Sequence, residues 1–473
     1  MNKTVSKKAK PKKSISEIES GTVRETLLEL LRMMKKVDFR KKAGLSSHEE
    51  LTQKHYLVIT IEQLLKEARE NKWGLRKNED KLYVYNGTHW QLVNKDDLTL
   101  FLGIAARKMG VKEYDAKFYQ FRDKLMKQFI STAHFPTPNK PRGVTLINLK
   151  NGTFEITPDE RKLREFRRSD FLKYQLPFEY DPEAKCPMFE KYLNRVLPDK
   201  QLQKILSEFI GYVFISIRTL KLEKTLILLG VGANGKSVFF DIINALLGKE
   251  NISNFTLQSL TTGNGYERAS MADKLVNNAS EISNRMNVDL FKQLVSGEPV
   301  EARQIYGKPH MLEDYAKLIF NCNELPITIQ HKEAYFRRFI IIPFDQKIPP
   351  KEQNPKLARQ IIDSELPGIF NWVLDGLERL LEQEDFTESD KVNSVLNKYR
   401  TETNSVKHFL NENGIKRGVE KEVHLKEMYN SYKEFCKDEN FKSLGKTNFS
   451  NYLQELGFQK KRINTGMVIC TEK

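Results

Sequence analysis

The hydrophobic and polar positions of this chain form their clearest pattern between residues 225 and 247. Thr225–Leu229 is a short apolar run, which predicts a buried strand. Gly230–Ser237 follows at once and is rich in glycine. Val238–Leu247 then carries apolar residues at helical spacing and ends before Gly248, a helix stop signal. The pattern predicts a strand, a tight loop and a helix in direct succession.

Upstream of this block, residues 21–175 combine strand and helix patterns. Leu82–Val93 and Thr145–Ile156 each alternate around an Asn-Gly pair, which is typical of a β-hairpin. Leu98–Gln128 has helical spacing with basic faces. We expect a mixed α/β accessory or assembly domain here. Residues 176–223 have helical spacing and predict a helical collar ahead of the apolar strand.

Downstream of the Gly-rich loop, the patterns continue the same α/β alternation. Met286–Ser296 has one apolar face and predicts a helix. Further strands are predicted at residues 274–281, 300–306, 316–323 and 339–344. The second of them turns at Gly307-Lys308-Pro309, which predicts a hairpin tip.

The C-terminal part contains a helical lid and a further small domain. The lid is predicted from Pro367 to about residue 390 and is rich in acidic residues. Met428–Phe435 and Phe449–Gly457 have helical spacing, and Phe458–Cys470 predicts a hairpin. Two helices followed by a basic wing are typical of a winged helix, which we expect within residues 395–473.

The composition of the chain indicates a polyanionic partner. The 473 residues carry a net charge of +16, an excess that favours nucleic acid. The four cysteines are scattered without zinc-ligand spacing, which indicates reduced thiols in an intracellular protein. No apolar run approaches the length of a membrane span, so we expect no membrane partner and a cytoplasmic location. The basic tail at residues 1–20 lacks the apolar core of a signal peptide and is expected to be disordered.

The Gly-rich loop supplies the main candidate chemistry. Gly-x-x-x-x-Gly-Lys-Ser between a strand and a helix is the context of a phosphate-binding loop, because backbone N–H groups and the helix N-terminus face the phosphates. We therefore predict ATP and Mg²⁺ as cofactors. Lys236 is expected on the β- and γ-phosphates, and the Ser237 hydroxyl on Mg²⁺. The predicted nucleotide-binding residues are Gly230, Gly232, Ala233, Asn234, Gly235, Lys236 and Ser237.

Four further stretches of the predicted motor contain candidates for chemistry. Glu281 ends a predicted strand, where a carboxylate can polarise the attacking water near the metal. Asn323 ends another strand and can contact the γ-phosphate or simply cap the strand. Lys308 at the hairpin tip can grip a nucleic-acid phosphate or remain a solvated turn residue. Arg337 and Arg338 precede a buried strand, and an arginine there can act on a neighbouring subunit's nucleotide.

Together these stretches resemble the superfamily 3 helicases of the AAA+ class, most closely the primase–helicases of poxvirus, phage and plasmid type. The resemblance rests on Gly-Ala-Asn-Gly-Lys-Ser, Ala-Ser-Glu281, Gly-Glu-Pro-Val-Glu-Ala-Arg303, Cys-Asn323 and Phe-Arg-Arg338-Phe. It runs from about residue 50 to the C-terminus. One departure is Ser280, which stands before Glu281 where many helicases carry Asp.

The resemblance implies specific roles. Glu281 would activate water and, with Ser237, hold Mg²⁺, while Asn323 would sense the γ-phosphate. Arg338 would be the arginine finger, with Arg337 as the alternative. Lys308 would be the hairpin contact with DNA, and Arg303 and His310 are further candidates beside it. Separately, the winged-helix pattern makes Lys446, Lys460, Lys461 and Arg462 candidates for phosphate contacts, with a winged fold used only for packing as the alternative.

The expected fold is an α/β chain with an AAA+ P-loop motor. The predicted domains are a basic tail (1–20), an N-terminal domain (21–175), a helical collar (176–223), the motor (224–366), a lid (367–394) and a winged helix (395–473). The resemblance implies a ring, usually a hexamer, that moves along single-stranded DNA. The region before the motor shows no acidic metal triad, so we expect a helicase without its own primase.

The leading hypothesis is an ATP-dependent replicative DNA helicase of a virus, phage or mobile element. It would act on single-stranded and forked DNA beside a separate primase or polymerase. The alternative is an ATP-switched initiator or loader that melts origin DNA without processive unwinding. A packaging or transposition ATPase is a third and weaker hypothesis.

Overall fold

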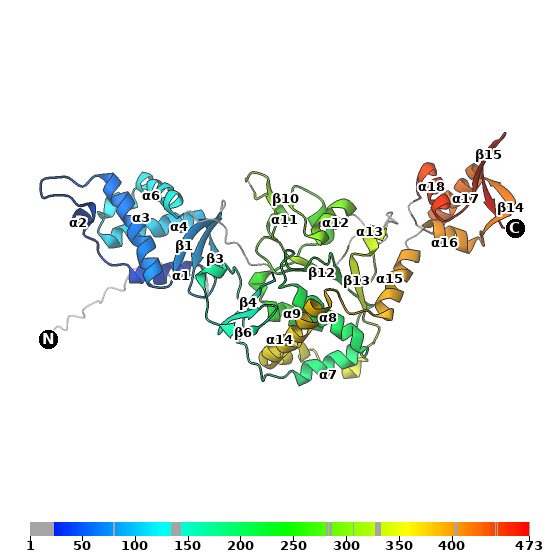
Figure 1. Cartoon of the computed structure of the whole chain (residues 1–473), viewed down its shortest axis with the longest axis horizontal. Helices are drawn as coiled ribbons and strands as arrows, with labels where there is room; N and C mark the ends of the chain where they lie inside the picture. The colour runs from blue at the N-terminus through cyan, green and yellow to red at the C-terminus, as the bar shows by residue number, and fades with distance from the viewer. Residues whose placement is uncertain are drawn as a thin grey trace, which may run out of the picture. The chain divides into compact units, whose positions relative to one another are not determined.

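The structure is a computed structural model. It describes residues 23–78, 81–133, 143–280, 282, 286–305, 307–326, 333–402, 405–439, 441 and 443–472. The predicted basic tail at residues 1–20 lies outside this described part. The chain divides into two compact units, Met1–Leu176 and Pro177–Lys473 (Figure 1). Among the described helices, none combines the length and the apolar character that crossing a membrane requires.

The N-terminal unit is mixed α/β, as its patterns predicted. Its helices are α1 (Val23–Met33), α2 (Phe39–Ala43), α3 (Gln53–Glu70), α4 (Lys95–Met109), α5 (Glu113–Lys117) and α6 (Tyr119–Thr132). One antiparallel sheet contains β1 (Gly74–Asn78), β2 (Lys81–Tyr85) and β3 (Trp90–Val93). A second contains β4 (Thr145–Leu149), β5 (Gly152–Ile156) and β6 (Arg161–Arg164). The helices bury a shared apolar core that includes Leu64, Leu102 and Phe129.

Both predicted hairpins of this unit form. Strands β2 and β3 pair with Tyr85 opposite Trp90, so the Asn-Gly pair opens a four-residue loop. Strands β4 and β5 pair with Leu149 opposite Gly152. The second turn thus lies one residue earlier than the Asn-Gly pair indicated, because Gly152 already belongs to the strand.

The second unit is built on a five-stranded parallel sheet. Its strands are β7 (Thr225–Leu229), β8 (Ile252–Ser253), β9 (Val276–Ala279), β12 (Lys317–Cys322) and β13 (Phe339–Pro343). Their order is β13-β7-β12-β9-β8, and every neighbouring pair is parallel. Strand β7 therefore lies inside the sheet. Because all the strands are parallel, their carboxyl ends meet at one edge.

Helices complete this α/β body. They are α7 (Pro187–Val196), α8 (Lys200–Tyr212), α9 (Lys236–Leu247), α10 (Leu257–Thr261), α11 (Tyr266–Ala269), α12 (Val288–Ser296), α13 (Glu333–Phe336), α14 (Leu357–Gln383) and α15 (Asp390–Glu402). Short 3₁₀ turns lie at Lys249–Asn251 and Pro350–Glu352, and another lies in the N-terminal unit at Arg168–Asp170. A separate two-stranded ribbon pairs β10 (Val300–Ala302) with β11 (His310–Leu312).

Helix α14 differs from the predicted lid. It begins ten residues before Pro367, so the predicted boundary between residues 366 and 367 falls inside one continuous helix. Proline normally breaks a helix interior, which explains the prediction. Here tertiary contacts compensate: the buried Glu365 carboxylate accepts hydrogen bonds from the backbone N–H groups of Met188 and Phe189. Gly376 packs against Ser207 so closely that a Cβ atom would lie 2.3 Å from its carbonyl carbon.

The C-terminal part consists of helices and a small antiparallel sheet. The helices are α16 (Ser405–Glu412), α17 (Leu425–Asp438) and α18 (Lys446–Glu455). The strands β14 (Arg417–His424), β15 (Lys460–Ile463) and β16 (Gly466–Thr471) follow the order β14-β16-β15. The two helices and the hairpin predicted here are confirmed, with Ile463 opposite Gly466 across a two-residue loop.

Candidate active site

The Gly-rich loop joins β7 directly to α9, as the sequence predicted. Gly230 begins the loop, and a Cβ atom there would lie 2.2 Å from Asn234 Nδ2 and 2.7 Å from the Phe344 carbonyl oxygen. Gly235 ends it with φ +87° and packs against Val196. Gly232 and Ala233 also have positive φ values, of 59° and 48°. Only glycine fits the close approach at Gly230, so the loop conformation depends on that residue.

Two buried side chains hold the loop from inside. Asn234 Nδ2 donates a 3.0 Å hydrogen bond to the Phe344 carbonyl. Lys236 Nζ donates to the Gly230 carbonyl and, at 3.1 Å, to Asn234 Oδ1. Burial lowers the pKa of Lys236 below the ordinary value for lysine. The ammonium group thus lies inside the loop curve, bonded to neutral acceptors that a phosphate can replace.

The first turn of α9 faces outward from this loop. Its N-cap is Gly235, which has no side chain to cap the first N–H groups. The Ser237 side chain is exposed at the same turn. Uncapped N–H groups at a helix N-terminus attract anions. A nearby residue that the sequence analysis missed, Tyr192, donates a 2.8 Å hydrogen bond to the Gly235 carbonyl from α7.

Strand β12 brings Asn323 to the start of the loop. Cys322 is opposite Leu229 in the parallel register, and the Gly230 N–H donates to the Cys322 carbonyl at 3.2 Å. Asn323 follows immediately and is exposed. Burial raises the pKa of the Cys322 thiol to about 12, with the Lys236 charge acting in the opposite direction. The strand ends thus bring Asn323 together with the loop.

Glu281 lies outside the described residues. Strand β9, which precedes it in the sequence, is described. Strand β9 ends at Ala279, opposite Phe320 of β12, and Ser280 follows it. The Asn278 amide group donates a 2.6 Å hydrogen bond to Asn244 Oδ1 of α9. Strand β9 therefore ends, at Ala279, at the same sheet edge as the loop.

Arg337 and Arg338 lie at the other end of β7. The Arg338 carbonyl accepts from the Thr225 N–H at 2.8 Å, and the Arg337 carbonyl accepts from Lys224 Nζ at 2.7 Å. Strand β7 separates them from Gly230 by about 16 Å at the usual strand rise. The structure therefore brings neither arginine to the loop of its own chain.

The two arginines differ in exposure. The Arg338 guanidinium is buried and donates to Ser296 Oγ at 2.8 Å and to the Ala334 carbonyl. The Arg337 side chain is 56% exposed, and its guanidinium meets Glu223 at 2.9 Å. Burial favours a higher pKa for Glu223, but the Lys221 hydrogen bond and the arginine charges outweigh it and lower that pKa. Arg337 is thus the accessible member of the pair.

The predicted DNA hairpin forms, with shorter strands than expected. Strand β10 stops at Ala302, whereas the apolar pattern had extended the strand to Tyr306, which is not among the described residues. The chain leaves the ribbon because Arg303 Nε donates to the Gly307 carbonyl at 3.0 Å. Lys308 and His310 are exposed beyond this turn, whereas Arg303 is half-buried.

The predicted C-terminal DNA contacts occupy one helix start and one strand. Lys446 is exposed at the beginning of α18. Lys460 is half-buried on β15, where Lys461 and Arg462 are exposed. Lys461 also approaches Glu422 of β14 at 3.6 Å.

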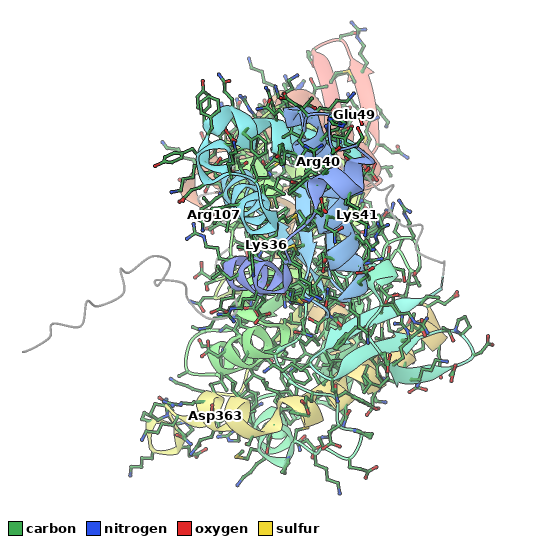
Figure 2. All side chains as sticks on the ribbon, turned by 90° about the vertical axis from the view of Figure 1, so that its left-hand side faces the viewer. Lys36, Arg40, Lys41, Glu49, Arg107 and Asp363 are labelled. Atoms are coloured by element: carbon green, nitrogen blue, oxygen red, sulfur yellow. The ribbon has the colours of Figure 1, made fainter. Side chains whose placement is uncertain are left out.

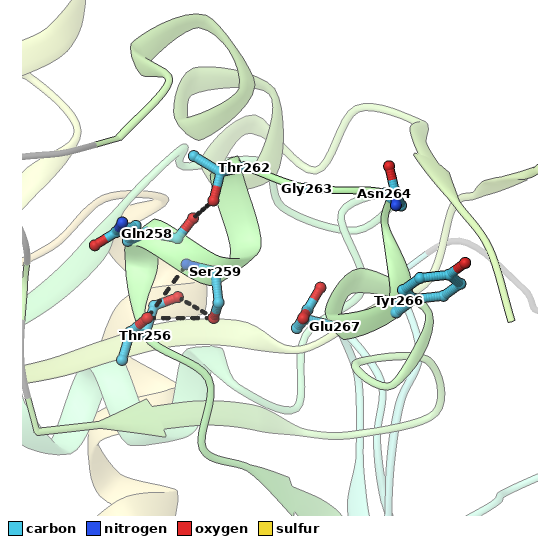
Figure 3. A pocket seen from close by; sticks show the side chains of 8 residues that line it. All are labelled: Thr256, Gln258, Ser259, Thr262, Gly263, Asn264, Tyr266 and Glu267. Atoms are coloured by element: carbon cyan, nitrogen blue, oxygen red, sulfur yellow. Dashed lines mark hydrogen bonds between the residues drawn. The ribbon is translucent and has the colours of Figure 1, made fainter. Parts of the chain in front are cut away.

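A polar hollow that the sequence analysis did not anticipate lies between α10 and α11 (Figure 3). It encloses about 370 Å³. Its lining residues are Thr256, Gln258, Ser259, Thr262, Gly263, Asn264, Tyr266 and Glu267. Thr256 caps α10 by accepting from the Ser259 N–H at 3.2 Å. The adjoining Gly265 carbonyl accepts from the Arg303 N–H, so this hollow adjoins the base of the hairpin.

Comparison with known proteins identifies the type of chain. Residues 61–198 match the family described as D5 N terminal like, and residues 388–469 match the family described as Poxvirus D5 protein-like. Residues 228–338, which contain the loop, match a family of unknown function, DUF5906. The chain is similar to Putative helicase 121R of Invertebrate iridescent virus 3, with 24% identity over 332 residues. The chain is thus similar to D5-like proteins of the superfamily 3 helicase type.

The D5-like chain matches only part of its curated relatives. The match to helicase 121R covers 61% of this chain and 34% of that protein. Putative helicase L207/L206 of Acanthamoeba polyphaga mimivirus is 23% identical over 255 residues, or 51% of this chain and 26% of that protein. Among solved structures, the apo C-terminal region of NrS-1 has 13% identity and a TM-score of 0.48 and covers 88% of this chain and 98% of that one.

Proposed function

We propose that this D5-like chain is an ATP-driven DNA helicase motor that works as a ring in the replication of a viral or other mobile genome. The observation that carries the proposal is the opposite placement of two parts on β7. The phosphate-binding loop follows its carboxyl end, and the arginine pair lies at its amino end. A site built from both parts requires two subunits, which favours a closed ring.

The loop residues fit an ATP phosphate chain. Gly230 leaves room for the buried Asn234 amide, and the uncapped start of α9 presents N–H groups to an anion. Lys236 would exchange its two loop acceptors for the β- and γ-phosphates. Mg²⁺, when bound, would be held by the exposed Ser237 hydroxyl with Glu281 and would screen phosphate charge. Asn323, in register beside the loop, is suited to contact the γ-phosphate.

The arginine finger is assigned by comparing how exposed the side chains of Arg337 and Arg338 are. Sequence resemblance pointed first to Arg338, but its guanidinium is buried against Ser296 and Ala334. Arg337 is 56% exposed and can reach a neighbouring subunit after releasing Glu223. We therefore propose Arg337 as the finger, with Arg338 holding the chain that presents it. Since exposed ion pairs contribute little free energy, the Glu223 contact is a weak restraint.

We assign the nucleic-acid contacts to basic side chains that are exposed. Lys308 and His310 at the hairpin would grip single-stranded DNA, whereas Arg303 shapes the turn through its bond to Gly307. The C-terminal helices and three-stranded sheet suit a winged helix whose basic strand β15 contacts phosphates. The parallel sheet with an internal loop-bearing strand suits the AAA+ class. A hexamer on forked DNA, served by a separate primase or polymerase, is the proposed assembly.

The competing function is an ATP-switched initiator or loader that melts an origin without processive unwinding. It would use the same loop but would need no repeated coupling between the hairpin and hydrolysis. A strand-displacement assay on forked DNA with ATP separates the two, because only a helicase displaces long duplexes repeatedly. Displacement limited to one short melted segment would favour the initiator.

Replacing Glu281 by glutamine is expected to slow hydrolysis strongly while ATP still binds. The amide removes the group that would polarise the attacking water but keeps the side-chain shape. Phosphate release and fluorescent-nucleotide binding, measured on the same preparation, check this. Glu267→Gln, at the polar hollow, is the matched control. Turnover by Glu281→Gln close to that of the unsubstituted chain would remove Glu281 from the proposed mechanism.

Replacing Lys308 by alanine is expected to uncouple hydrolysis from unwinding. Basal ATP turnover should stay nearly unchanged, because Lys308 is on the ribbon and not at the loop. Strand displacement should fall, since the hairpin would lose a phosphate contact. Lys308→Arg keeps the charge and serves as the control. Equal displacement by the alanine variant and the unsubstituted chain would exclude this contact.

A further inference from the structure

The net positive charge of the chain belongs almost entirely to one unit. Residues 1–176 contain 37 Lys and Arg against 22 Asp and Glu, whereas residues 177–473 contain 41 against 40. The proposed motor is therefore nearly neutral, and the N-terminal unit carries a net charge of +15. An excess of this size is the electrostatic signature of a surface that meets a polyanion.

Exposed aromatic rings gather at one corner of the same unit. Tyr114 is 87% exposed, Tyr119 64% and Phe118 48%. They are the three aromatic residues among the exposed large hydrophobic side chains of the described part of the chain. Phe118 and Tyr119 also contact each other edge-on, with ring centroids 5.2 Å apart. Rings of this size are normally buried, so such clustering at a surface marks a binding site.

The corner that presents these rings is rigid. Phe118 ends α5 and caps α6, and its N–H donates to the carbonyls of Tyr114 and Asp115. Beneath it, Arg122 Nε donates to the Ala116 carbonyl at 3.1 Å. Arg122 lies so close to Gly103 that a Cβ atom there would be 2.7 Å from Nε. A fixed base means that the rings lose little freedom when a ligand stacks on them.

Cations surround the rings. Residues 107–128 contain seven Lys and Arg against three Asp and Glu. Arg107, Lys112 and Lys117 are exposed, and Glu113 pairs with Lys117 at 2.6 Å and with Arg107 at 3.5 Å. Glu113 therefore shares its charge between two bases, and the cations of residues 107–128 outnumber the acids.

A second set of cations reaches the same helix end. The Val37 N–H donates to the Met109 carbonyl at 2.8 Å, so the chain after α1 runs along the end of α4. Figure 2 shows Lys36, Lys41 and Arg107 on the side of this unit that faces the viewer. The basic surface thus extends from α2 past the end of α4 toward the aromatic corner.

We propose that the α5–α6 corner of the N-terminal unit binds single-stranded nucleic acid outside the motor. Unpaired bases would stack on Tyr114, Phe118 and Tyr119, and the backbone phosphates would lie along Arg107, Lys112 and Lys117. Stacking on exposed rings beside a basic track is the way proteins hold single strands without reading their sequence. In duplex DNA the base faces are covered by neighbouring bases, so the surface selects unpaired strands.

This contact is separate from the proposed hairpin contact at Lys308 and needs no ATP hydrolysis. A second strand-binding surface would keep the chain on DNA between cycles. Net charge decides between nucleic acid and a second copy of the chain as the occupant. Two copies of a unit with a net charge of +15 repel each other, whereas a single strand is attracted.

The test measures how tightly the full chain, without ATP, binds fluorescent oligo(dT). An oligonucleotide of about 20 nucleotides is longer than one such surface needs. Every protein carries Lys308→Ala, so that the hairpin contribution is constant. Adding Tyr114→Ala and Tyr119→Ala should weaken binding at least about tenfold at every salt concentration with an unchanged salt slope. Adding Lys112→Gln and Lys117→Gln instead should lower the slope by about one for each lysine.

Three controls sharpen the result. Tyr114→Phe with Tyr119→Phe keeps the rings and should bind as before. Leu100→Ala removes an apolar side chain of α4 that is 48% exposed, the same as Phe118, and should have no effect. A duplex of equal length should respond little to loss of the rings, and oligo(rU) in place of oligo(dT) tells whether the surface accepts RNA as well.

Photocrosslinking locates the contact directly. Oligo(dT) containing 5-iodouracil should crosslink to the tryptic peptides 113–117 and 118–122, which contain the three rings. Unchanged affinity of the ring variants, with no crosslink in these peptides, would overturn the proposal. So would a change in oligomeric mass on ring removal with unchanged DNA affinity, because that result identifies the corner as a contact between copies. Because the binding is measured without ATP, a chain that proved to have no helicase activity could still pass or fail this binding test.

Discussion

Replacing Arg337 by alanine is expected to lower ATP turnover by about 10³- to 10⁵-fold, the contribution of an arginine finger. Its guanidinium is exposed at the amino end of β7, and about 16 Å of extended chain separates that end from the loop of its own chain. A neighbouring subunit's loop is then the nucleotide site it can serve. The measurement is steady-state phosphate release at saturating ATP and DNA.

Mixing variants tests whether the arginine acts between subunits. Arg337→Ala and Lys236→Ala proteins should each be nearly inactive, but together they form some interfaces that contain an intact loop and an intact arginine. Part of the turnover should therefore return, once exchange of labelled subunits has been demonstrated. Exchange without any recovery would show that the arginine acts within its own chain.

Arg338→Ala is the informative companion in the same experiment. Its side chain is buried on Ser296, so its loss should lower the thermal stability of the fold. Arg338→Lys keeps the charge but cannot reproduce the two-ended hydrogen bonding. Recovery on mixing for Arg338→Ala but not for Arg337→Ala would return the finger role to Arg338, the residue that the sequence resemblance pointed to.

Replacing Lys236 by alanine is expected to reduce ATP turnover by at least about 10²- to 10³-fold, as loss of one preorganised donor to developing negative charge does. The buried ammonium donates, within the described part of the chain, to the Gly230 carbonyl and to Asn234 Oδ1. Its removal takes away the positive charge that the loop itself offers to the β- and γ-phosphates. Fluorescent-nucleotide binding should weaken as well, because the lost interaction is charge-assisted.

Lys249→Ala is the matched control, because that lysine is exposed just beyond the other end of α9. It should hydrolyse ATP normally. A Lys236→Ala protein with turnover similar to that of the control would contradict the nucleotide-site assignment and the helicase proposal together. Thermal unfolding of both variants shows whether a loss of ATP turnover is caused by loss of the fold.

Much of the fold could be predicted because the relevant signals are local. The strand Thr225–Leu229 matches its predicted bounds, since apolar spacing and glycine positions act within a few residues. The helix ends at Leu247 as predicted and begins at Lys236, two residues before the predicted start. The exceptions are also physical. Pro367 indicated a helix start, but packing of Glu365 and Gly376 against neighbouring helices carries α14 through it.

The candidate site divides in the same way. Sequence analysis named Lys236, Ser237 and Asn323, and the structure brings them together because β7 and β12 are parallel neighbours in register. It ranked Arg338 above Arg337 on the family resemblance alone. The local pattern could not tell which of two adjacent arginines is buried. It also found only basic helices where the structure presents the ring cluster of Tyr114, Phe118 and Tyr119.

By itself, the sequence determined the strand, Gly-rich loop and helix from Thr225 to Leu247, because glycine conformation, strand and helix are specified by neighbours along the chain. It also determined the basic character of the N-terminal unit, because charge is a matter of composition. Only the tertiary structure decided the strand order, the burial of Arg338 and the exposure of the aromatic corner. Each of these depends on contacts between residues far apart in sequence, which local spacing does not encode.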